Sequence, residues 1–309
     1  MPQPNVSPQI MPDRPNETSA STRQAQEVVS GTLYVVGTPI GNLEDMTFRA
    51  VKILRQVDVI AAEDTRHTGK LLHHFQIGTP QISYHTHNQH HRVPELLQRL
   101  QSGQAIALVS DAGMPSISDP GYILVRACRD AGLAVSPIPG PSAGVTALSA
   151  AGLATDRFVF EGFLPAKGRD RRDRIAALKS EARTVILYEA PHRLRHTLGD
   201  LTDALGGDRP LVVARELTKR YEEFWEGTLA SAVERYTERN PQGEFTLILA
   251  GAATEPLELS DTDIKAELQR LLSQGLSHSD ASRQLAQQAA LSRRHVYQLA
   301  LSLKETKRP

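Results

Sequence analysis

From Gly31 onward, short apolar runs alternate with amphipathic segments. The runs TLYVVG, VDVIAA, AIALVS and VSPIP are too short for buried helices, whereas TFRAVKILRQ and YILVRACRDAG carry apolar residues at helical spacing. Strands that alternate with helices in this way predict an α/β layer on a largely parallel sheet. We expect this first unit to cover residues 31–151 and to end with the helix that follows the turn PGPSA, with Ser142 as its N-cap.

A second α/β series follows over residues 152–252. Its apolar runs are RFVFEGF, TVILYEA, PLVVARE and EFTLILAG, again separated by helical patterns. The run FWEGTLA lies close behind ARELTKRYEE, which predicts an antiparallel hairpin and therefore a mixed sheet.

The two ends of the chain have different patterns. Residues 1–30 are rich in Pro, Ser, Gln and Asn without an apolar period, so we expect a disordered tail. Residues 253–309 predict a polar linker and a small domain of three amphipathic helices. The last two of these helices resemble a helix-turn-helix, although a helical cap that docks on the body would show the same pattern.

Composition narrows the class of protein. The 309 residues balance 35 Lys and Arg against 35 Asp and Glu, so the chain as a whole is not an obvious polyanion binder. Its single cysteine, Cys128, excludes a disulfide framework and lies in an apolar helical pattern typical of a packed, inert thiol. No apolar run reaches the ~18 residues of a membrane span. We therefore expect a soluble, cytoplasmic protein.

Three glycine- and proline-rich loops follow strands of the first unit. They are GTPIGN, SDAGMPSISDPG and PGPSAG. In a parallel sheet, loops at the carboxyl ends of strands converge on bound ligands, and glycine lets the backbone approach them closely. None matches the dinucleotide or phosphate-loop fingerprints. The alternative is that they are merely tight turns between strand and helix.

Several long motifs resemble one known family. GTLYVVGTPIGNLEDMTFRA, LVSDAGMPSISDPGY, PGPSA, YEAPHRL and ARELTK are similar to the bacterial small-subunit ribosomal RNA 2′-O-methyltransferases of type I, within the tetrapyrrole methylase superfamily. The resemblance implies two α/β domains with an S-adenosylmethionine cleft between them, a homodimer, and methylation of a cytidine 2′-hydroxyl in 16S ribosomal RNA, within the ribosomal subunit. By motif position it assigns the cofactor contacts to Pro39, Asp111, Ala112, Gly113, Ile117, Ser142, Ala143, Tyr188, Ala214 and Thr246.

The segment AEDTRHT follows a predicted strand and offers acid and base types side by side. A ribose hydroxyl is a weak nucleophile, so a nearby base is worth ~10²–10⁴-fold in rate. We expect Glu63 or Asp64 to orient or deprotonate the hydroxyl while Arg66 holds a phosphate. The alternative for Asp64 is a helix N-cap. Glu189 and Glu216 are the next candidates, with strand-end ion pairs as their alternative.

Other segments suggest contacts with RNA. Seven of the eleven histidines lie between His67 and His91, but this polar loop lacks the ligand set of a zinc site, and we expect no metal. The run KGRDRRDR is either a phosphate-contacting rim or a solvated helix face. The expected RNA contacts are His85, Asn88, Arg171, Arg172, Arg174, Arg293 and Arg294.

Two competing functions remain open at this point. A tetrapyrrole C-methyltransferase would share the three-loop cleft, but the basic segments 167–183 and 281–309 favour an extended polyanion over a porphyrinoid. A non-catalytic nucleic-acid-binding regulator could use the helix-turn-helix with a degenerate methylase body. Because these basic segments are offset by acidic ones elsewhere, the zero net charge is an average and is compatible with an RNA enzyme.

Overall fold

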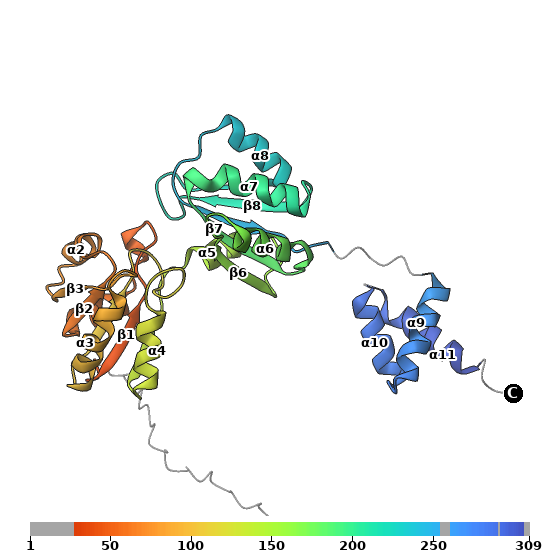
Figure 1. Ribbon diagram of the computed structural model, residues 1–309, viewed down its shortest axis with the longest axis horizontal. Helices are drawn as coiled ribbons and strands as arrows, with labels where there is room; N and C mark the ends of the chain where they lie inside the picture. Colours follow the sequence, from red (N-terminus) through yellow and green to blue (C-terminus); the bar gives the residue numbers. More distant parts are fainter. Residues whose placement is uncertain (1–27, 254–259, 290, 306–309) are drawn as a thin grey trace, which may run out of the picture.

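The computed structural model describes residues 28–253, 260–289 and 291–305 (Figure 1). The predicted tail therefore lies outside the described residues as far as residue 27, as does the linker over residues 254–259. At the start of the described chain, Val28 packs against the first hydrophobic core. The backbone N–H of Val29 donates a hydrogen bond of 2.9 Å to the Tyr34 hydroxyl.

The first unit is a parallel α/β layer, as the sequence predicted. Its sheet has the order β3-β2-β4-β1-β5, and every neighbouring pair is parallel. Its elements are β1 (Thr32–Val36), a 3-10 turn η1 (Leu43–Asp45), α1 (Phe48–Gln56), β2 (Val59–Ala62), α2 (Thr65–His74), β3 (Gln81–Ser83), α3 (Gln89–Gln101), β4 (Ile106–Val109), α4 (Tyr122–Asp130) and β5 (Ala134–Ile138).

Helices cover both faces of this sheet, which is why its central strands are continuously apolar. All residues of β1, β2 and β4 are buried. Helices α1 and α2 pack on one face, and α3 and α4 pack on the other. Cys128 of α4 is a free, fully buried thiol in the second of these cores, in agreement with its predicted packing role.

The second unit is a mixed sheet, also as predicted. Its order is β6-β7-β10-β8-β9; β6 and β7 are parallel, and the other pairs, including the β8–β9 hairpin, are antiparallel. Its elements are β6 (Phe158–Phe163), α6 (Arg169–Ala177), a 3-10 turn η2 (Leu178–Ser180), β7 (Thr184–Glu189), α7 (Pro191–Leu205), β8 (Pro210–Arg215), β9 (Glu223–Thr228), α8 (Leu229–Glu238) and β10 (Phe245–Leu249).

Helix α5 (Ala143–Ala150) joins the two units. The sequence placed it at the end of the first unit, yet its apolar face packs on the second sheet (Figure 1). Ala147 and Leu148 contact the same cluster as Ile186 of β7 and Ile248 of β10. The opposite face of that sheet is covered by α6, α7 and α8. Two covered faces explain why β7, β8 and β10 are mostly apolar and buried.

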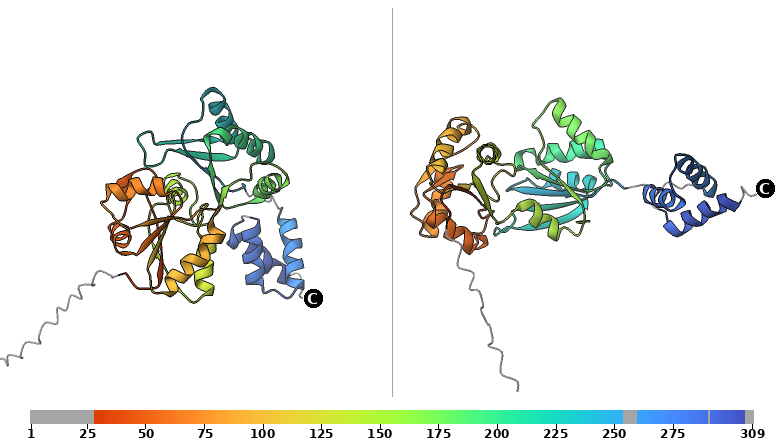
Figure 2. Two further views of the ribbon diagram at one scale, coloured as in Figure 1. Left: turned by 60° about the vertical axis from the view of Figure 1, so that its left-hand side comes forward. Right: turned by 90° about the horizontal axis from the view of Figure 1, so that it is seen from below.

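Three helices form the C-terminal unit: α9 (Asp261–Ser273), α10 (His278–Gln288) and α11 (Arg293–Glu305), seen from two further directions in Figure 2. They bury a core of their own side chains, among them Leu268, Ala281 and Val296. Ser260 and Asp263 form a capping box at the start of α9. Within the described residues, no helix is both long and apolar enough to cross a membrane.

Candidate active site

The three glycine-rich loops meet, as predicted, at the carboxyl edge of the first sheet. Thr38 and Gly113 exchange two backbone hydrogen bonds of 2.9 and 3.0 Å, which ties the first loop to the second. The first and third loops touch through backbone alone, because a Cβ added to Gly37 would lie 2.7 Å from the Cα of Gly140. Glycine is required at both positions because the two chains leave no room for side chains.

A cavity of about 410 Å³ lies where these loops face the second sheet. We call it the cofactor cavity. Its size falls within the ~300–1,000 Å³ of small-molecule sites. Eight of the residues that the family resemblance assigned to the cofactor line it: Asp111, Ala112, Gly113, Ile117, Ser142, Ala143, Tyr188 and Thr246.

The other two predicted cofactor residues lie elsewhere. Pro39 lines an adjoining cavity, and Ala214 is fully buried against α5, in the cluster that contains Leu148. Ser142 occupies the N-cap position of α5, but its side chain makes no capping hydrogen bond. Instead, the Tyr188 hydroxyl accepts the N–H of Gly144 at 3.0 Å. A residue of the second sheet therefore caps α5, and the hydroxyl of Ser142 does not.

Five carboxylates line the cofactor cavity, and three of them come from the first unit: Glu63, Asp111 and Asp119. Glu63 accepts the backbone N–H of Asp111 at 3.3 Å, and Asp111 accepts the N–H of Asp64 at 3.1 Å. Burial raises the pKa of Glu63. Burial, with the negative charges of Glu63 and Asp111, raises the pKa of Asp119 to about 7.

Asp119 was not among the site residues predicted from the sequence, although it lies in the SDPG end of the second loop. None of the ion pairs among the described residues involves Glu63, Asp111 or Asp119. The first-unit side of the cavity therefore carries carboxylates that form no ion pair within the described chain, whereas Glu189 and Glu244 on the other side pair with Arg193 and Lys219. This lining fits a cationic ligand such as S-adenosylmethionine, which carries a sulfonium and an ammonium group.

Asp64 is a helix cap. Its carboxylate accepts the N–H of Arg66 at 2.8 Å at the start of α2 and pairs with the Arg66 guanidinium at 2.8 Å. These bonds hold the pKa of Asp64 well below its usual range. The Arg66 side chain is 88% exposed, so it faces solvent beside the cap. The capping alternative thus accounts for Asp64, while Glu63 reaches the cavity.

Arg171 differs from the prediction that placed it on an RNA-facing rim. Its side chain is 4% exposed, because it turns inward from α6 and donates to Asp200 at 2.7 Å and to the Thr197 hydroxyl at 2.9 Å. Thr197 in turn donates to Glu189, which is buried and lines the cofactor cavity. Arg171 therefore braces a cavity wall and is not available to a phosphate. A charge run alone cannot reveal which arginine points inward.

The neighbouring arginines remain on the surface. Arg172 is exposed, and Arg174 is partly exposed while paired with Glu161 of β6 at 2.5 Å. Glu216 forms an ion pair of 2.9 Å with Lys219 at the end of β8, and this is the strand-end ion pair expected as the alternative to a catalytic role. Arg293 and Arg294 are exposed at the start of α11. Ala290, in the predicted break before this helix, lies outside the described residues.

The histidine-rich segment forms a turn stabilised by Asn88. Asn88 accepts the backbone N–H of His85 at 2.9 Å and donates to the Ser83 carbonyl at 3.2 Å. His85 is half-buried near Glu63, and its charge lowers the pKa of that carboxyl against the larger effect of burial. No group of three or more potential metal ligands occurs in the part of the chain that the structure describes.

Comparison with known proteins shows which family shares this fold. The family of Tetrapyrrole (Corrin/Porphyrin) Methylases matches residues 32–233. Among solved structures, diphthine synthase superposes with a TM-score of 0.57 at 16% identity, over 71% of this chain and 89% of that one. A uroporphyrin-III C-methyltransferase from Thermus thermophilus, in complex with S-adenosylhomocysteine, superposes with a TM-score of 0.52 at 19% identity, over 71% and 97%. These likenesses show a shared fold.

Relatives found by sequence have a much higher sequence identity to this chain. A protein of Synechocystis sp. named ribosomal RNA small subunit methyltransferase I is 60% identical over 274 residues, which cover 88% of this chain and 98% of the relative. A protein of the same name from Escherichia coli O157:H7 is 50% identical over 238 residues, or 76% and 83% of the two chains. The chain therefore belongs to the ribosomal RNA small subunit methyltransferase I family, within the tetrapyrrole methylases.

Proposed function

We propose that this protein transfers a methyl group from S-adenosylmethionine to the ribose 2′-hydroxyl of a cytidine in 16S ribosomal RNA. The observation that carries the proposal is the cofactor cavity, where eight motif residues from both units line one acidic pocket. The name of the relative that is 60% identical supports the RNA substrate. When bound, the cofactor supplies a methyl group activated by a positively charged sulfur.

The chain contributes orientation and exclusion of water. Methyl transfer needs oxygen, carbon and sulfur in line, and a preformed dry pocket supplies much of the rate through this alignment. Tyr188 is fixed by its bond to Gly144 and by edge-to-face contacts with Phe160 and Phe163, at 5.0 and 5.7 Å between ring centroids. These contacts fix the position of Tyr188 in the cavity wall of the second unit.

The acceptor hydroxyl must also lose a proton. Glu63 and Asp119 are the carboxylates that line the cavity with raised pKa values, whereas Asp64 is committed to the α2 cap. A group with a pKa of about 7 matches proton transfer at neutral pH. We therefore assign proton acceptance to Asp119 or Glu63. The role for Arg66 as a phosphate contact stays a proposal, supported by its exposure.

The proposal also covers the RNA contacts, the cellular compartment and the oligomeric state. Arg172, Arg174, Arg293 and Arg294 are on the surface, where they can meet RNA phosphates at the ribosomal subunit. The cytoplasm is the expected compartment for such a substrate, and the family resemblance supports a homodimer. His85 and Asn88 shape a turn next to Glu63, so we keep them on the substrate side of the cavity.

One experiment separates this function from its competitors. Purified protein is incubated with S-adenosylmethionine labelled in the methyl group, in parallel with small ribosomal subunits that lack ribose methylation and with a porphyrinoid. The modified product is mapped, and binding of cofactor and RNA is measured separately. A labelled cytidine 2′-O-methyl group supports the proposal. Label in a porphyrinoid but not in RNA would indicate the C-methyltransferase. Cofactor and RNA binding without any transfer would indicate the non-catalytic regulator.

A further inference from the structure

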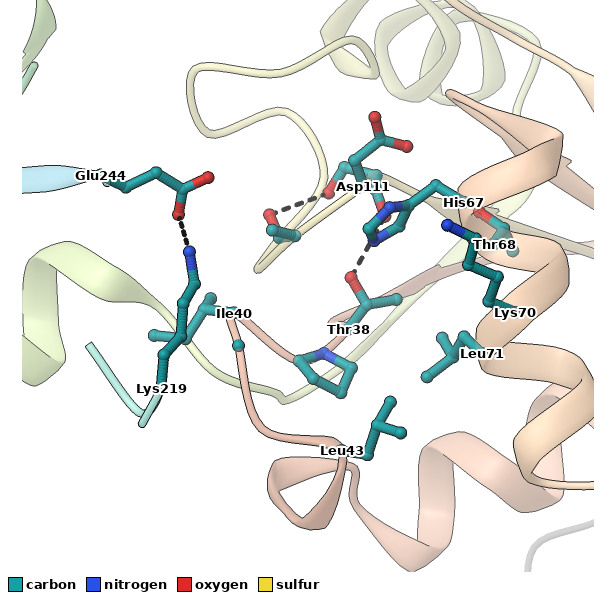
Figure 3. Close-up of a pocket in the computed structure, with 14 residues that line it drawn as sticks. Thr38, Ile40, Leu43, His67, Thr68, Lys70, Leu71, Asp111, Lys219 and Glu244 are labelled. Carbon is teal, nitrogen blue, oxygen red and sulfur yellow. Dashed lines mark hydrogen bonds and ion pairs between the residues drawn. The ribbon is translucent and has the colours of Figure 1, made fainter. Parts of the chain in front are cut away.

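A second cavity, of about 360 Å³, adjoins the cofactor cavity (Figure 3). It is formed by the first loop, by helix α2 and by the turn after β8. The two cavities share four lining residues, so they lie directly side by side: Ile40, Asp111, Ala112 and Glu244. A ligand in the second cavity is therefore within reach of a group carried in the first.

One side of the second cavity is apolar. Pro39 and Ile40 of the first loop line it together with Leu43 of η1 and Leu71 of α2, and Leu43 lies on the same side of the cavity as Leu71 (Figure 3). Leu43 is a large apolar side chain that remains 39% exposed, in an element with no buried residue. An apolar surface of this kind suits the face of a base that has been taken out of a stack.

The rim of the cavity is cationic. His67 and Lys70 lie one turn apart on α2, both exposed, and neither takes part in an ion pair among the described residues. Lys219 comes from the second unit and is held by Glu216 at 2.9 Å and by Glu244 at 2.9 Å (Figure 3). Because its charge is offset by two carboxylates, Lys70 is the lining lysine free to meet a phosphate, and the exposed imidazole of His67 lies beside it.

We propose that the second cavity receives the single nucleotide whose ribose is methylated. Its base lies against Pro39, Leu43 and Leu71, its phosphate faces Lys70 and His67, and its ribose lies beside the shared residue Asp111. The volume admits one nucleotide and no duplex, so the target is bound as an unstacked, single-stranded residue. This inference rests on the proposed RNA methylation and adds the position of the acceptor.

Two variants test the assignment through different properties. Lys70→Glu reverses the charge of the rim, and Leu43→Trp fills the cavity from a position that is already partly exposed. Lys52→Glu is the matched control: the same charge reversal on helix α1, at a residue that lines neither cavity. For each variant, kcat and KM are measured with undermethylated small subunits over a series of salt concentrations. The dissociation constant for S-adenosylmethionine is measured separately by calorimetry without RNA.

We expect Lys70→Glu to raise KM for the subunit about tenfold and to reduce the slope of log affinity against log salt by about 1, as for one lost phosphate contact. We expect Leu43→Trp to lower kcat/KM at least about 100-fold through steric exclusion. Cofactor affinity should stay within about twofold in both, and Lys52→Glu should match the wild type.

The inference is overturned if both variants keep wild-type kcat/KM, or if they weaken cofactor binding as much as methylation, since the cavity would then be part of the cofactor site. If the wild-type protein does not methylate the small subunit, the proposed function itself is wrong. Wild-type activity with unaffected variants would remove the nucleotide assignment alone.

Discussion

Replacing Asp119 with asparagine tests the central electrostatic feature of the cavity. Burial and the neighbouring carboxylates Glu63 and Asp111 raise the pKa of Asp119 from 3.8 to about 7. Because the pKa is higher in the folded state, folded protein holds this proton more tightly than unfolded protein between these two values. The free energy of unfolding therefore falls as pH rises from about 4 to about 7, and then levels off.

The size of the effect follows from the shift. A change of about 3 pKa units at ~1.4 kcal/mol each gives at most ~4 kcal/mol of destabilisation by ionised Asp119 above pH 7. Asparagine cannot ionise and has nearly the same shape. Asp119→Asn should therefore unfold with nearly the wild-type free energy at pH 4, but should be more stable than wild type by up to that amount at pH 8.

Urea unfolding followed by circular dichroism, in the absence of cofactor and at constant ionic strength, measures this difference at pH 4, 5, 6, 7 and 8. Asp130→Asn is the control, because Asp130 is exposed and pairs with Arg126 on the surface of α4. A stability difference between Asp119→Asn and wild type that is the same at pH 5 and pH 8 would refute the reasoning. If Asp119 also accepts the proton, its replacement should remove the rise of kcat with pH near 7.

Further outcomes follow from packing and burial. Gly37→Ala should abolish cofactor binding, measured by calorimetry, because the added methyl meets the backbone of Gly140 at 2.7 Å; retained affinity would contradict the loop contact. Arg171→Ala should lower the urea midpoint by the equivalent of ~3 kcal/mol, because it removes a buried guanidinium together with its hydrogen bonds to Asp200, Thr197 and the Pro165 carbonyl. Arg172→Ala should change stability by less than ~0.5 kcal/mol and weaken RNA binding instead, as a salt titration would show. The thiol of Cys128, fully buried and with its pKa raised to about 11 by burial, should react with a thiol reagent in urea but not in the native protein.

Local pattern was sufficient for much of the architecture. Short apolar runs predicted the strands, because a strand covered on both faces is apolar at nearly every position, as in β4. Helix α5 shows the limit of this reasoning. Its apolar positions predicted a buried helix but could not say which sheet would cover it, since both sheets offer apolar faces.

The residues of the candidate site were likewise predictable from the sequence only in part. Motif positions predicted the residues of the three loops, and eight of the ten predicted cofactor residues line one cavity. Three outcomes needed the folded chain: Asp64 is a cap, Arg171 is buried, and Asp119 lies beside Glu63. Each depends on where a side chain points or on which distant residue faces it, and neighbouring sequence does not encode this.

By itself, the sequence determined the order and type of the elements, the glycines that allow the loops to touch, and the family to which the chain belongs. These properties follow from backbone sterics and from the periodicity of apolar residues, which act over a few residues. The tertiary structure alone decided the acidity of the cavity, the inward turn of Arg171 and the presence of a second cavity behind Asp111. These properties arise from burial and from Coulombic interactions between residues brought together from distant parts of the chain.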